Sequence, residues 1–223
     1  MNFKDKVGLS GRVEIFVTKG KPPVIPGKVN EKIKNPPGYP VIYEDAIIDF
    51  SNHLIIHQEV IENKIVNIGK DSVIKSLSTG FIKVIARMAM GDRGTLPSDP
   101  TVPKTPTGSM SALFNEVYRA DVDVTTMNTG TPTEHSIKFI KTFSAVEIPI
   151  TAFSNQAKPV ANEVGLIIAD LLSGAPLPRL PVSAPSLPLS DEELFAIRTF
   201  KSVPFEIANE IAITIRYTIY IQE

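Results

Sequence analysis

The segment Ile211-Ala-Ile-Thr-Ile-Arg-Tyr-Thr-Ile-Tyr-Ile221 decides the fold of this chain. Every second residue from Ile211 to Ile221 is large and apolar, and the positions between them hold Ala, Thr, Arg, Thr and Tyr. Alternation with a period of two is typical of a β-strand that buries one face. Eleven residues at about 3.3 Å each predict a strand of about 36 Å. Such a strand crosses a whole β-sandwich or reaches a neighbouring subunit.

Shorter stretches with the character of strands precede this segment. They are residues 13–18, 43–50, 84–90, 121–126, 137–143, 194–200 and 205–207. Residues 84–90 are apolar on both faces except at Arg87, as in the middle of a sheet that is covered on both sides. We therefore expect a mainly β protein, an antiparallel β-sandwich of the jelly-roll or immunoglobulin-like type. One or two short helices are expected, from Asp71 to Gly80 and after Ser109.

The composition describes a globular chain without indicating a function. Of 223 residues 43% are hydrophobic, which excludes wholesale disorder. The formal charge of −1 argues against a globally basic nucleic-acid-binding protein. The absence of cysteine excludes disulfides, Cys-ligated zinc and a thiol nucleophile. There is no secretory signal in residues 1–6 and no run of the ~20 apolar residues that a membrane span needs, so we expect no membrane association.

Proline divides the chain into regular and irregular parts. Fifteen of the 19 prolines lie in three clusters, over residues 22–40, 97–106 and 176–188. Proline lacks an N–H group and is kept out of central strands and helix interiors, so each cluster predicts a long loop. We expect a basic, proline-rich N-terminal strand and extended arm over residues 1–40. A single β-sandwich domain follows over residues 41–223, with insertions at about 95–107 and 174–190.

The N-terminal arm (residues 1–40) is the candidate for contacts between subunits. It holds eight Lys or Arg and three Asp or Glu, while the rest of the chain is net negative. A basic arm on an acidic body suits the lacing of neighbouring copies, and a solvated loop is the alternative. Nucleic acid is a weaker candidate, because the aromatic residues of the arm are too sparse for base stacking. The candidate contact residues are Lys19, Lys21, Lys28, Lys32, Lys34 and Tyr39.

Groups suited to catalysis or metal binding are sparse. His53 and His57, with Glu59 nearby, would lie about 13 Å apart along a strand, too far to share a metal ion. The acidic run 191–193 indicates a helix start or a solvated face, because a glycosidase needs two carboxylates that converge across a cleft. The run 69–71 lacks the remaining residues of a phosphate-binding loop. We expect no catalytic residue, no cofactor and no metal site, and an enzyme is the less favoured class.

A series of short motifs occurs in an order that resembles a known family. The motifs are Gly8-Leu9-Ser10-Gly11-Arg12-Val13-Glu14-Ile15, Asn63 to Lys70 before a helix, Met88-Ala89-Met90-Gly91-Asp92, Ala112 to Arg119, Asn162-Glu163-Val164-Gly165-Leu166, and Leu194 to Phe200. In this order the chain resembles a family of tailed-bacteriophage virion proteins from tail, baseplate, collar and fibre-attachment regions. The resemblance covers most of residues 8–221 except the loops. The proline-rich insertions at 20–40 and 174–190 depart from the family pattern.

The resemblance implies a β-sandwich without catalytic activity that assembles in the host cytoplasm into a virion. The expected partners are further copies of the chain, in a ring or cluster, and other proteins of the tail, baseplate or neck. The alternative is a receptor-binding or fibre-tip module that recognises host carbohydrate, although aromatic residues make up only 7% and Trp is absent. An enzyme such as a cell-wall hydrolase would be favoured if two carboxylates, or a His and a carboxylate, converged in one cleft.

Several motif residues also have expected roles in the scaffold. Gly91 permits a sharp exit from a buried strand or a positive φ, and Gly165 permits a turn before residues 166–168. Arg119 and Arg198 are expected to pair with Glu116 or Glu163 across strands.

Overall fold

The alternating segment forms the long strand β15 (Ile211–Gln222), as its sequence predicts. It pairs antiparallel on one side with β1 (Gly8–Lys19) and on the other with β11 (Glu134–Ser144). The register with β1 is unbroken from the pair Gly8–Gln222 to the pair Lys19–Ile211. Ile213, Ile215 and Tyr217 are fully buried on one face, because a strand directs alternate side chains to the same side.

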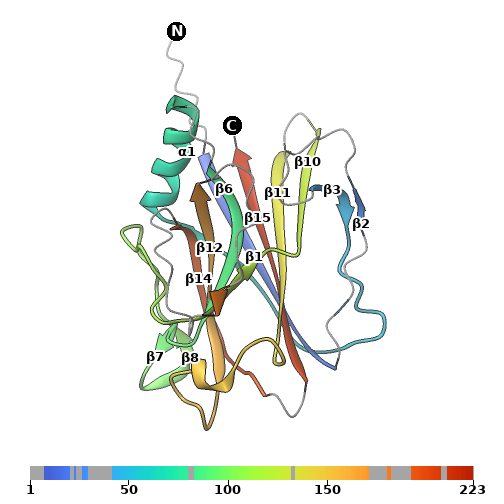
Figure 1. The fold of residues 1–223 in the computed structure, drawn as a ribbon, viewed down its shortest axis with the longest axis vertical. Coiled ribbons are helices and arrows are strands. Elements are labelled where there is room, and N and C mark those ends of the chain that lie inside the picture. The colour runs from blue at the N-terminus through green and yellow to red at the C-terminus, as the bar shows by residue number, and fades with distance from the viewer. Residues whose placement is uncertain are drawn as a thin grey trace.

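The computed structural model describes residues 8–20, 23, 27–29, 42–79, 83–131, 134–170, 180–181, 192–206 and 210–222. Most of these residues form two sheets that pack against each other as a β-sandwich (Figure 1). The predicted fold class, a mainly β protein with packed antiparallel sheets, is therefore confirmed.

The strands of the two sheets follow one another in runs along the chain. The seven-stranded sheet has the order β2 (Gly27–Val29), β3 (Ile42–Ala46), β10 (Val124–Thr131), β11, β15, β1 and β4 (Leu54–Glu62). The six-stranded sheet has the order β13 (Leu180–Pro181), β9 (Glu116–Asp121), β6 (Lys83–Gly91), β12 (Val160–Asp170), β14 (Glu193–Pro204) and β5 (Lys64–Ile65). The short strands β7 (Thr95–Leu96) and β8 (Asp99–Pro103) form a separate hairpin. All pairings are antiparallel except that of β3 with β10.

The main core lies between the sheets and is built from their inner faces. Met88 and Met90 of β6 and Phe200 of β14 pack in one cluster with Phe143 and Tyr217 from the opposite sheet. The hydroxyl of Tyr217 donates a hydrogen bond of 3.1 Å to the carbonyl oxygen of Val164 on β12, which joins the two sheets. Burial raises the pKa of Tyr217 far above its ordinary value, so this phenol stays protonated and serves as a donor.

Helix α1 (Asn67–Thr79) confirms the first expected helix but begins before Asp71. Gly69 lies in its first turn, where a Cβ atom would come within 2.3 Å of the carbonyl oxygen of Phe195. A glycine therefore lets the helix lie directly on β14. A short 3-10 turn (Ile150–Ala152) is the other helical element among the described residues.

The prediction of a second helix after Ser109 is wrong. Residues 109–115 form turns and irregular chain, and β9 begins at Glu116. The physical reason is a competitor from another strand, because the backbone N–H groups of Phe114 and Asn115 donate to the carboxylate of Glu163 on β12.

Three strand predictions differ from the structure in their bounds. The strand expected over 43–50 ends at Ala46, and the chain that follows packs Ile48 and Phe50 on Phe16 of the outer sheet face. The stretch 121–126 spans the end of β9 and the start of β10. Residues 194–204 form one strand, and Phe205 lies beyond it. Gly165 lies inside β12, so the expected turn there is also wrong.

The described parts of residues 1–40 belong to the sandwich. β1 occupies an interior position of the seven-stranded sheet, between β15 and β4, and β2 forms the opposite edge. Within the described ranges we find no helix that is long and apolar enough to cross a membrane.

Candidate functional site

The predicted contact residues of the arm do not form one cluster where the structure describes them. Lys19 is the exposed last residue of β1, and Lys28 lies in β2. The sheet order places β15, β11, β10 and β3 between these two strands. Lys21, Lys32, Lys34 and Tyr39 lie outside the described residues.

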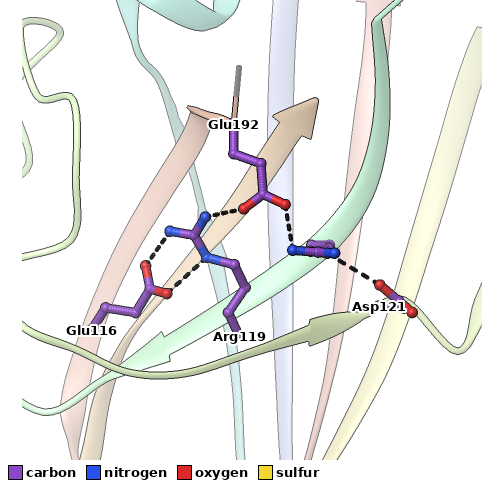
Figure 2. A network of polar contacts seen from close by, with 5 residues as sticks. Glu116, Arg119, Asp121 and Glu192 are labelled. Carbon is purple, nitrogen blue, oxygen red and sulfur yellow. Dashed lines mark hydrogen bonds and ion pairs between the residues drawn. The ribbon is translucent and has the colours of Figure 1, made fainter. Parts of the chain in front are cut away.

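A chain of ion pairs on the six-stranded sheet is the most distinctive polar feature of the described residues (Figure 2). Arg87 on β6 donates to Asp121 over 3.2 Å and to one carboxylate oxygen of Glu192. Arg119 on β9 donates to the other oxygen of Glu192. It also forms a bidentate pair with Glu116, with both distances 2.7 Å. We name these five residues the arginine network.

The arginine network is buried at its centre and more exposed to solvent at its ends. The side chain of Arg87 is 1% exposed and that of Glu192 is 5% exposed, whereas that of Asp121 is 41% exposed. A buried charge is costly unless it is paired and hydrogen-bonded. Burial lowers the pKa of Arg119, but the carboxylates of Glu116 and Glu192 outweigh it and raise this pKa above its ordinary value. Arg119 is therefore held firmly in its charged form.

The carboxylates of the network are engaged by guanidinium groups. Glu116 and Glu192 share the guanidinium of Arg119, and Glu192 also pairs with Arg87. Arg119 pairs with the expected partner Glu116, but within β9 and not across strands as predicted.

The arginine network lies where the proline-rich insertion 174–190 rejoins the sandwich. Glu192 directly follows this insertion and precedes β14. The two residues of β13, within the same insertion, pair with β9 in the register Leu180–Arg119 and Pro181–Tyr118. Arg119 thus pairs with Leu180 inside the insertion through the backbone and with Glu192 after it through an ion pair.

A second polar cluster fixes the loops at one end of the six-stranded sheet. Glu163 is completely buried, and it accepts hydrogen bonds from the backbone N–H groups of Phe114 (2.8 Å), Asn115 (2.8 Å) and Arg93 (3.2 Å). Burial nevertheless raises the pKa of Glu163 above its ordinary value. The expected pairing of Glu163 with an arginine side chain is wrong, because backbone amides occupy its two oxygens.

The same cluster explains Gly91. A Cβ atom at this position would lie 2.3 Å from the carbonyl oxygen of Asn115 and 2.5 Å from Oε1 of Glu163. Gly91 does not have a positive φ. Its role is close approach, and of the two expected roles the positive φ is wrong. Asp92 completes the cluster, because it accepts from the Asn115 side chain (2.7 Å) and from the backbone N–H of Ser154 (2.6 Å).

The histidines and Lys141 form no comparable network among the described residues. Nε2 of His57 lies 3.5 Å from a carboxylate oxygen of Glu59 on the same strand. Within the described ranges, no group of three His, Asp or Glu side chains is placed to hold a metal ion. Lys141 is buried in a hollow beside Asp123, 3.0 Å away, and Glu147, 3.8 Å away, so its charge is balanced by two carboxylates.

The sequence contained a signal for the arginine network that spacing alone could not complete. Arg87 is the one charged residue in an otherwise apolar stretch, and such a residue needs a buried partner. Its partner Glu192 is 105 positions away.

A comparison with models of known protein families, with curated proteins and with solved structures gave no match.

Proposed function

We propose that this protein is a structural component of a tailed-phage virion, located in the tail, baseplate or neck. It assembles in the host cytoplasm through protein–protein contacts with further copies of itself and with neighbouring virion proteins. The order of sequence motifs and the β-sandwich both support this role. The arginine network is the observation that carries it.

The arginine network gives the proline-rich insertion fixed points of attachment. Buried ion pairs contribute little net stability but penalise any arrangement that separates them. Glu192, just after the insertion, and β13, within it, therefore lie at defined positions on β9 and β6. A segment that is held at such points in advance loses less conformational entropy when it binds a partner. This arrangement suits a loop that contacts neighbouring subunits, and we assign that role to the insertion 174–190.

The polar clusters favour a structural role over a catalytic one. The two oxygens of Glu192 are engaged by two guanidinium groups, and those of Glu163 by three backbone amides. A general acid or base instead needs a proton-transfer partner within reach. The basic residues of the arm, Lys19 among them, would complement acidic surfaces of neighbouring copies.

The composition of intact phage particles tests this function. Particles of the phage that encodes the chain are purified by density gradient, and the chain is quantified by mass spectrometry against the major capsid protein. We expect a fixed, small number of copies per particle and antibody labelling at the tail, baseplate or neck in electron micrographs. A phage protein without a place in the virion serves as the control and should be lost in the gradient.

Two results would contradict the proposal in different ways. If the chain is abundant in infected cells but absent from purified particles, it is not a virion component. If the antibody labels the fibre tips, the receptor-binding alternative is supported instead.

A further inference from the structure

The outer strands of the two sheets differ greatly in length. Among the described strands, β2 has three residues, β13 two and β5 two, whereas β4 has nine. Proteins commonly protect sheet edges with very short strands, with Lys or with Pro, because an edge strand can pair with another chain. β4 contains neither Lys nor Pro. Short length, Lys and Pro therefore do not protect the edge of β4, and its bulge lies at one end, before the regular segment 57–62.

One edge of β4 pairs with β1, and no other described strand pairs with its second edge. Apolar side chains of β4 are exposed there. Leu54 is 64% exposed, Ile56 51% and Val60 47%. A bulge near Ile56 interrupts the pairing with β1, and the six residues His57–Glu62 then run in regular register with Val17–Arg12. A regular strand with exposed apolar groups and one unpaired edge is a typical surface for strand addition.

We propose that a second copy of this chain binds antiparallel along β4 and forms one continuous sheet with it. This inference rests on the proposed function and deepens it, because it names the partner and the surface through which subunits join. A two-fold axis perpendicular to the sheet relates the two strands. The axis passes through the position where Gln58 faces Gln58 of the partner subunit.

Charge selects this register among the neighbouring ones. With Gln58 at the axis, each His57 lies opposite Glu59 of the partner subunit, and the imidazole can donate to the carboxylate. With Glu59 at the axis, two carboxylates would lie directly opposite each other, which is unfavourable. With Val60 at the axis, Glu59 would face the apolar Ile61 of the partner subunit.

The single chain leaves hydrogen-bonding groups unused on this strand. Nε2 of His57 and Oε2 of Glu59 are buried atoms without a hydrogen-bond partner, although they lie 3.5 Å apart. Buried polar atoms normally have such partners. On pairing of two copies we expect both side chains to turn toward the partner subunit, which supplies an acceptor for each His57 and a donor for each Glu59.

A cysteine at the axis tests the register directly, because the chain has no cysteine of its own. Residues directly opposite each other in an antiparallel pair have Cα atoms about 4.5–5.5 Å apart, within the range of a disulfide. Gln58→Cys should therefore give a covalent dimer under mild oxidation. Glu62→Cys is the matched control, since its two copies would lie about 26 Å apart and should remain unlinked.

The mass in solution provides the second measurement. We expect the wild-type protein to have at least twice the 24.3 kDa mass of the chain in light scattering. Val60→Lys should reduce it to a monomer with unchanged circular dichroism. Ile74→Lys, at a position of α1 that is 62% exposed, should leave the mass unchanged.

The outcomes separate this inference from the proposed function. A monomeric wild-type protein, or linking of Glu62→Cys but not of Gln58→Cys, overturns the pairing along β4 whether or not the chain is found in particles. A covalent Gln58→Cys dimer from a chain that is absent from particles supports the pairing and overturns the virion role.

Discussion

Removal of Glu192 should destabilise the protein strongly. Glu192→Ala takes the carboxylate away from Nη1 of Arg87, whose side chain is 1% exposed. Breaking a buried ion pair by removing one partner costs up to about 3–5 kcal/mol where the remaining charge is left uncompensated, and Arg87 keeps only part of its compensation through the 41% exposed Asp121. For a chain of this size that loss lowers Tm by roughly 6–20 °C. Arg119 contributes less to the loss, because it keeps its bidentate partner Glu116.

The free energy of unfolding, measured by urea denaturation, checks this expectation. Asp121→Ala is the matched control, since Asp121 pairs with the same arginine but is 41% exposed; its loss should be below about 1 kcal/mol. The double variant Arg87→Met/Glu192→Met should regain most of the stability, because both buried charges are removed together. If Glu192→Ala loses no more than Asp121→Ala, burial does not hold the charge of Arg87 and the reasoning is refuted.

Three further variants test other parts of the fold. Glu14→Gln should cost about 2 kcal/mol at neutral pH: burial raises the pKa of Glu14, but Arg216 outweighs burial and lowers it. This stabilisation is present above pH 4.5 and is lost as the pH falls through the lowered pKa, so wild type and variant should converge in acid. Glu163→Ala should cost roughly 3–5 kcal/mol, because three backbone N–H groups lose their acceptor, a fully buried carboxylate. Gly69→Ala should cost about 1–3 kcal/mol through its clash with Phe195, although helix propensity alone would favour it.

The three variants share a control in an exposed position. Asp71→Ala, at an exposed position of α1, should change the free energy of unfolding by less than about 0.5 kcal/mol in the same urea titration. A Glu14→Gln variant whose deficit persists unchanged at low pH would contradict the lowered pKa. A stabilised Gly69→Ala would contradict the close approach of α1 to β14.

The fold could be predicted where its signal is local. The alternation in residues 211–221 is the geometry of the strand itself, so β15 follows directly from the sequence. The helix after Ser109 could not be rejected in this way. Glu163 accepts from the amides of Phe114 and Asn115 but lies 49 and 48 positions away from them. Local patterns carry no information about such a distant competitor.

The candidate site shows the same division. Arg87 could be recognised as a charge in an apolar strand. Its partner Glu192 could not, because the acidic run 191–193 is typical of a helix start or a solvated face. Gly91 could be recognised as special, yet the cause is a neighbouring carbonyl and not its own φ. The contact residues of the arm rest on charge alone, and their role remains a prediction.

The pairing of β1 with β15 sets an order of events during synthesis. The hydroxyl of Thr18 donates a hydrogen bond to the carbonyl oxygen of Ala212, 194 positions away. β11 also pairs with β15, so it too has no partner on that side until β15 is made. Contacts between distant segments form slowly and leave unpaired strand edges exposed in the meantime. The seven-stranded sheet therefore cannot close on the ribosome until residues 211–222 have emerged. We expect chains that stop short of this strand to keep the edges of β1 and β11 uncovered and therefore to aggregate.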